Sequence, residues 1–278
     1  MHPDVSPPQS ARDSVIARLA ALALPVFAGI AWMLLAGAAT SQIALQLVAL
    51  AIGCALIVVG ARLAFPAKPL GVALVVLLYL PLALGPEVGG EQRWLALGPV
   101  TLTSGLLCVP ALSVLLARAR RSWFVGPLAL IFVASLVQSD PSITIALAMV
   151  IFVLGGINLV AIAGGLLILA IGAYLALRDT LEPVRFVEGV FPDAFAQMPL
   201  MTWVLIAALV ISLGLLLWRA GAPAKEKAAL VASMTGLIGV SLIGPFPTPL
   251  VGYGAASILG LSLALAILGR DPEGGHPA

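Results

Sequence analysis

Residues 159–177 read LVAIAGGLLILAIGAYLAL, an apolar run between Asn158 and Arg178 that contains no charged side chain. A helix of about 20 such residues spans the hydrocarbon core of a bilayer, so the run predicts a transmembrane helix. The whole chain has this character, because 62% of its 278 residues are hydrophobic, 9% are charged and the mean hydropathy is +1.16. The composition excludes a soluble globular domain and indicates an integral membrane protein.

Similar apolar runs, separated by Gly, Pro and charged residues, predict an all-α polytopic bundle of about ten spans. The expected cores are Leu19–Thr40, Ile43–Phe65, Pro69–Leu84, Thr103–Ala117, Trp123–Val137, Ser142–Leu154, Leu159–Leu177, Leu200–Trp218, Ala228–Ile243 and Leu250–Leu268. The fourth to sixth are short, so re-entrant segments stay open as an alternative there. We expect one transmembrane domain over residues 19–268, with an N-terminal tail (1–18) and a C-terminal tail (269–278).

The charges predict the orientation of the bundle. Ten crossings put both termini on one side, and the positive-inside rule makes that side cytoplasmic, with 11 of the 14 Lys and Arg residues there. Three outer segments, Gly85–Gly98, Gln138–Pro141 and Arg178–Asp193, carry most of the remaining charge. Apart from Arg62, at the cytoplasmic end of the second core, the ten cores contain no Asp, Glu, Lys, Arg or His, which disfavours pumps and ion-driven carriers. The net charge of +2 indicates no nucleic-acid partner.

The residues that most hydrolases and metal sites use are scarce. His2 and His276 lie in the polar tails, so no triad that needs histidine forms within the membrane body. Cys54 and Cys108 lie inside apolar runs, and we interpret both as small core residues. Any binding or chemistry is therefore expected on the charged outer rim.

Four polar motifs follow one another on the predicted outer side. They are GEQRWLALG (90–98), QSDPSIT (138–144), LEPVR (181–185) and PLVGYGAAS (249–257). In this order, and with ten spans, they resemble the SEDS family of cell-shape and cell-division membrane proteins, of the RodA/FtsW/SpoVE type. The resemblance implies a bacterial plasma-membrane protein that polymerises an undecaprenyl-linked disaccharide into peptidoglycan at the outer face. It also implies a single-span penicillin-binding protein as partner, besides membrane lipid.

The chain departs from the SEDS pattern where catalysis is expected. Leu106 and Val109 stand where the family carries an acid and a base, which leaves the fold intact while arguing against the usual function. The fourth outer loop is short as well. Either Gln197 takes the position of the family's catalytic aspartate, or the catalytic stretch is deleted.

Glycosyl transfer needs a general base and a cationic partner for the departing pyrophosphate. We interpret Asp193 as the candidate base, with Asp179, Glu182 and Glu188 as lesser candidates. Arg93 and Arg185 are expected to bind pyrophosphate, alone or with a divalent cation held by the acids. The full set of candidate substrate-binding residues is Arg93, Trp94, Asp140, Glu182, Arg185 and Tyr253.

Three functions remain open at this stage. The first is a minimal SEDS-like glycosyltransferase. The second is a non-catalytic relative, a scaffold that docks a partner helix or a lipid-linked precursor, which the missing elements and the Gly- and Ala-rich spans favour. The third is a flippase for polyprenyl-linked lipids, which the absence of intramembrane charge makes the weakest.

Overall fold

The structure is a computed structural model that describes residues 9–63, 65–88, 90–98, 100–119, 121–178 and 183–269, without the side chains of 9–11 and 121–124. The helices and strands, in chain order, are α1 (Gln9–Leu35), α2 (Thr40–Gly60), α3 (Ala67–Tyr79), α4 (Pro81–Leu84), β1 (Trp94–Leu97), β2 (Val100–Thr103), α5 (Ser104–Arg118), α6 (Arg121–Val137), α7 (Pro141–Gly155), α8 (Leu159–Arg178), α9 (Val190–Gln197), α10 (Pro199–Arg219), α11 (Ala224–Ile243) and α12 (Ala255–Ile267).

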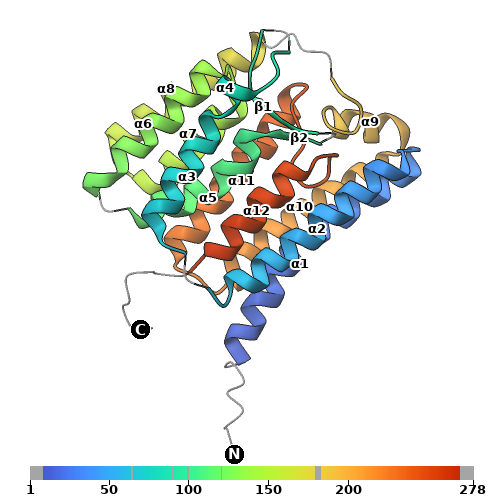
Figure 1. The fold of residues 1–278 in the computed structure, drawn as a ribbon, viewed down its shortest axis with the longest axis horizontal. Coiled ribbons are helices and arrows are strands. Elements are labelled where there is room, and N and C mark those ends of the chain that lie inside the picture. Colours follow the sequence, from blue (N-terminus) through green and yellow to red (C-terminus); the bar gives the residue numbers. More distant parts are fainter. Residues whose placement is uncertain are drawn as a thin grey trace, which may run out of the picture.

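The helices form the polytopic bundle that the apolar runs predict (Figure 1). Among the described residues, six helical segments are long and apolar enough to cross a membrane, and four shorter apolar helices complete the ten. The third span consists of α3 and α4 together. The chain is therefore a multi-pass membrane protein. Its first helix begins at Gln9, inside the segment expected to be a tail.

The centre of the bundle is made by α5, α7, α11 and α12. The α11 helix packs against α5 and α7, and α12 packs against α2 and α5. Most side chains of these central helices are buried, whereas α3 and α8 lie at the periphery and have two buried residues each. The short α5 crosses the whole bundle, because Ser104 follows the hairpin directly and Arg118 contacts the carbonyl of Ile267 at the end of α12. The re-entrant alternative is therefore wrong for α5.

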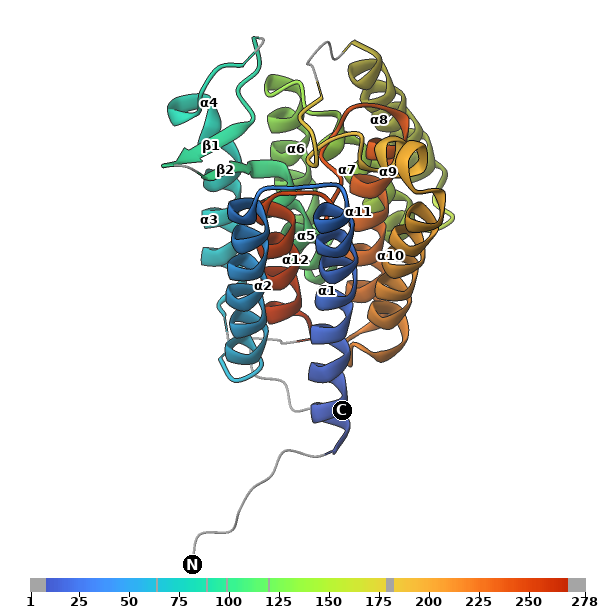
Figure 2. The ribbon, with the colours of Figure 1, turned by 90° about the vertical axis from the view of Figure 1, so that its right-hand side faces the viewer.

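The loops after α1, α4, α6, α8 and α11 gather at one end of the bundle, which we call the hairpin end (Figure 2). The three predicted outer segments meet there. Two elements at this end were not predicted from the apolar runs: the antiparallel hairpin of β1 and β2, in which Trp94 pairs with Thr103, and the short helix α9. Both carry candidate site residues.

The opposite end, where α1 begins and α12 ends, is held together by two arginines. Arg18 donates to the carbonyl oxygens of Ala220 at 2.9 Å and Leu265 at 3.0 Å. Arg118 binds both carboxylate oxygens of Glu226, at 3.0 and 2.9 Å. Arg118 also donates to the carbonyl of Ile267, so the last carbonyls of α12, where the helix dipole favours cations, are tied to α1 and α5.

Candidate functional site

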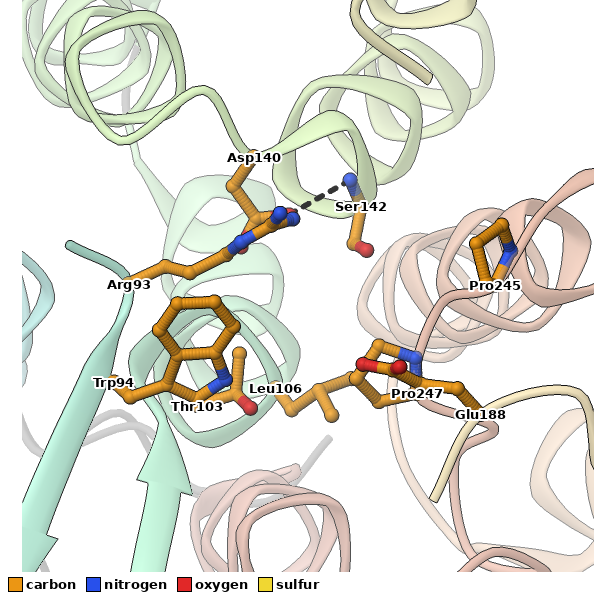
Figure 3. Close-up of a pocket in the computed structure, with 9 residues that line it drawn as sticks. All are labelled: Arg93, Trp94, Thr103, Leu106, Asp140, Ser142, Glu188, Pro245 and Pro247. Carbon is orange, nitrogen blue, oxygen red and sulfur yellow. Dashed lines mark hydrogen bonds between the residues drawn. The ribbon is translucent and has the colours of Figure 1, made fainter. Parts of the chain in front are cut away.

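Two neighbouring cavities lie at the hairpin end and share Glu188 and Pro245 in their walls. The smaller one, about 10 Å³, offers room for roughly one water molecule. It is lined by Arg93, Trp94, Thr103, Leu106, Asp140, Ser142, Glu188, Pro245 and Pro247 (Figure 3). The larger one, which we call the cleft, measures about 580 Å³. Of these two cavities in the described part of the chain, the cleft is the one large enough for a small-molecule ligand.

Arg93 is buried in the wall of the small pocket, among charged and aromatic neighbours. Its guanidinium forms an ion pair with Glu91 and lies 5.1 Å from the centre of the Trp94 ring. The same side chain points toward Asp140 (Figure 3). Because the arginine is buried among these partners, it holds the hairpin against the bundle rather than facing the cleft.

Asp140 is the N-cap of α7 and lies outside the membrane-spanning segment. Its Oδ1 accepts from the backbone N–H of Ser142 at 2.8 Å, while Oδ2 is buried without a hydrogen-bond partner among the described residues. The side chain is 1% exposed. Burial raises the pKa of Asp140 above its usual range, although the charge of Arg93 and the N–H of Ser142 act in the opposite direction.

The raised pKa predicts how stability depends on pH. The folded protein binds the Asp140 proton more tightly than the unfolded chain, so this stabilisation is present below about pH 4 and is lost as pH rises through the folded pKa. We expect Asp140→Asn, which keeps the capping oxygen, to remove this loss. Thermal unfolding in detergent should show that the unfolding temperature of the variant rises relative to that of the parent as pH increases toward neutrality. If the parent instead becomes more stable than the variant as pH increases, the attraction of the Asp140 carboxylate to Arg93 outweighs the effect of burial.

The cleft brings together one arginine and two carboxylates from the segment 183–198. Its walls are formed by Pro183, Arg185, Glu188, Gly189, Pro192, Asp193 and the stretch from Ser241 to Pro245. Asp193 is half-buried in the first turn of α9, and Arg185 is exposed, donating to the carbonyl of Ala36 at 2.8 Å. A carboxylate and a guanidinium in one cleft provide a proton acceptor and an anion-binding group.

Glu188 shapes the loop that carries these groups. Its Oε2 accepts from the backbone N–H of Val184 at 3.0 Å, and its own N–H donates to the carbonyl of Val184 at 3.0 Å. From the sequence, Glu188 was only a lesser candidate for the general base, but in the structure it lines both cavities. The turn that it closes fixes where Arg185 stands.

A second loop, residues 244–254, pairs with this turn. The N–H of Thr248 donates to the carbonyl of Val187 at 2.9 Å, and that of Tyr253 to Phe186 at 2.6 Å. Gly252 makes the approach possible, because a Cβ there would lie 3.0 Å from the carbonyl oxygen of Val187 and 3.1 Å from that of Phe186. From α2, the buried Gln46 donates to the carbonyl of Gly252 at 2.8 Å.

The structure separates the predicted site residues into groups. Arg93, Trp94 and Asp140 line the small pocket, and Arg185 and Asp193 line the cleft. Tyr253 belongs to neither set of lining residues and holds the two loops together through its backbone. Glu182 and Asp179 lie outside the described residues. Within the described part of the chain, no group of three or more His, Cys, Asp or Glu could hold a metal ion.

Sequence reasoning missed the cleft wall made by Ser241 to Pro245. The only signal was the spacing of three prolines in GPFPTP (244–249), which is typical of a rigid loop. Leu106 and Val109, which replace the expected acid and base, are both buried. Leu106 forms part of the small pocket, so apolar packing occupies the place where charge was expected.

A ten-span bundle with this hairpin end defines a polytopic membrane protein with the fold of RodA. The chain is similar to the rod shape determining protein RodA of Thermus thermophilus (TM-score 0.64) and to its aspartate-to-alanine mutant (0.66), both at 22% identity. These matches cover 89% of this chain and 93% and 94% of the RodA chains. The all-α fold implied by the SEDS resemblance is confirmed.

A third similar structure describes the coordination of polymerization and crosslinking by a peptidoglycan synthase complex. One of its chains matches with a TM-score of 0.58 and 22% identity, over 89% of this chain and 95% of that one. No protein-family model and no curated protein matches the sequence.

Proposed function

We propose that this protein is a divergent SEDS-type membrane protein that acts on a lipid-linked disaccharide in bacterial peptidoglycan synthesis. The observation that carries the proposal is the cleft at the hairpin end of a RodA-like bundle, where Asp193 and Arg185 share one wall. A polyprenyl tail fits against the lipid-facing helices, while a saccharide headgroup fits the cleft. The hairpin end then faces the outside of the plasma membrane, as the charge distribution predicts.

In glycosyl transfer, each of the charged residues that line the cleft would have a separate role. The attacking sugar hydroxyl bonds to the anomeric carbon of the donor, and the bond from that carbon to the pyrophosphate oxygen breaks. Asp193 accepts the hydroxyl proton, and Arg185 binds the departing pyrophosphate. Glu188 positions the loop that carries Arg185.

Asparagine at position 193 tests this assignment. It keeps the size of the side chain and removes the base, so we expect Asp193→Asn to lower polymerisation of labelled lipid-linked disaccharide by about 100-fold or more. The purified protein in vesicles is assayed with and without a divalent cation and a single-span penicillin-binding protein.

The matched control is Glu87→Gln, which neutralises an exposed carboxylate at the hairpin end that lies outside both cavities. We expect this variant to retain parental activity. Parental activity in Asp193→Asn as well would overturn the role of Asp193, and an equal loss in both variants would show a general effect of charge on the assay.

One observation favours a second function, that of a scaffold without catalysis. Leu106 and Val109 are packed into the core where the SEDS resemblance expects charge. In that case, the parent protein binds the precursor or a penicillin-binding protein but forms no glycan under any of these conditions. Binding by the parent that survives in Asp193→Asn, with no product from either, would identify the scaffold.

A further inference from the structure

The hairpin has two chemically different faces. Side chains alternate along a strand, so Leu95 and Leu97 of β1 share a face, and they pair with Leu102 and Val100 of β2. At the base of the hairpin this apolar face is closed, with Leu95 and Leu102 each 7% exposed and packed in the main core. At the tip it is open, because Leu97 is 63% exposed.

The tip projects sideways from the bundle, beyond α2 and α3 (Figure 2). In both views the hairpin lies lower than α4, which ends the span Ala67–Leu84 (Figures 1 and 2). The hairpin therefore lies within the height of a helix that is long and apolar enough to cross the membrane. Its buried base faces the bundle, while the open half of the same face, with Leu97, projects past α2 and α3.

Other exposed apolar side chains continue this surface. Val72 and Val76 are exposed along α3, which has few buried residues, and Leu84 is exposed at the end of α4, which contacts β1. The tip of the hairpin thus projects past a predicted span whose own outer side is apolar and exposed. A row of this kind on a membrane protein is covered by lipid.

We propose that the tip of the hairpin, through Leu97, inserts into the interfacial layer of the bilayer and anchors the hairpin there. The occupant of this face is lipid rather than a protein, because the tip projects past α3, whose outer side carries the exposed apolar residues Val72 and Val76 of a predicted span. The depth is interfacial, because a two-stranded hairpin has open edges whose backbone groups need water or headgroups.

Anchoring the tip has a consequence for the site. The opposite face of the hairpin carries Trp94 and Thr103, and both line the small pocket beside Asp140. The core holds the base of the hairpin and lipid holds its tip. Trp94 and Thr103 are therefore kept in a fixed position in the wall of the small pocket. This anchoring involves the hairpin and lipid alone and is independent of the proposed glycosyl transfer.

The test compares two labelled positions on opposite faces of the hairpin. Leu97→Cys and, as the matched control, Thr101→Cys are made in a Cys54→Ala background; the remaining Cys108 is fully buried. Thr101 is exposed and pairs with Ala96 on the other face. Each cysteine carries an environment-sensitive fluorophore, and the protein is placed in vesicles of phosphatidylcholine and phosphatidylglycerol that contain lipids with a nitroxide quencher near the headgroup.

We expect the label at position 97 to show blue-shifted emission and to lose most of its intensity to the lipid quencher, with little loss to aqueous iodide. The label at position 101 should show the reverse. If position 97 is quenched by iodide as strongly as position 101, the tip lies in water and the proposal is wrong. Shielding of position 97 from both quenchers would also overturn it, since protein would then cover the tip.

Discussion

Arg118→Ala is expected to lower the free energy of unfolding by about 3–5 kcal/mol, the usual effect of removing one partner from a buried ion pair. The arginine binds both oxygens of Glu226 and also donates to the carbonyl of Ile267. Both side chains are largely buried, at 14% and 9% exposure. Alanine would leave the carboxylate with the N–H of Gly269, at 2.8 Å, as its remaining donor in the described structure.

The measurement is equilibrium unfolding in mixed micelles, followed by circular dichroism. Arg62→Ala is the matched control, because Arg62 is an exposed arginine in the loop between α2 and α3, and we expect a change within about 0.5 kcal/mol. The double variant Arg118→Met with Glu226→Leu should recover most of the loss, since apolar side chains of similar volume replace buried ion pairs well. If the double variant is instead less stable than either single variant, loss of the ion pair is not the cause of the lower free energy of unfolding.

Gly260→Val is expected to have the second large effect, about 1–3 kcal/mol of destabilisation together with reduced activity. Gly260 of α12 lies against the backbone of α5, and a Cβ there would stand 2.1 Å from the carbonyl oxygen of Leu106. The atoms that would clash belong to the backbone, which cannot move aside as the end of a flexible side chain can. Valine therefore forces α12 and α5 apart. Leu106 lines the small pocket, so the displacement reaches the site.

Gly239→Ala provides the control for this prediction. Gly239 lies in α11, and a Cβ there would meet nothing within 4 Å, so alanine removes only backbone freedom from the unfolded chain. We expect this variant to be as stable as the parent or more so. Unfolding in micelles and the polymerisation assay, run on both variants, separate the effect of close packing from that of helix propensity. Equal stability of Gly260→Val and the parent would contradict the close approach of α12 to α5.

The site was predictable in part. The charge pattern placed three polar segments at one end of the bundle, and the structure confirms that they meet there. The pattern did not show that Arg93 is buried beside Glu91 and Asp140, whereas Arg185 lines the cleft with Asp193. These groupings arise between segments far apart in the chain, so periodicity and local composition carry no signal for them.

By itself, the sequence determined the helical class, the positions of the ten spans and the end of the bundle where charge gathers. These features are local, since the length of an apolar run and the position of a charge beside it set where a helix enters and leaves a membrane. Only the tertiary structure decided that Trp94–Leu97 and Val100–Thr103 form a hairpin, that α9 brings Asp193 to the cleft, and that Gly252 lets two loops pair. The hairpin pairs residues close in sequence, but two strands alone are marginally stable in water, so it depends on Leu95 and Leu102 packing into the core. The place of Asp193 and the pairing of the two loops depend on contacts between distant segments, whose geometry exists only once the helices have packed.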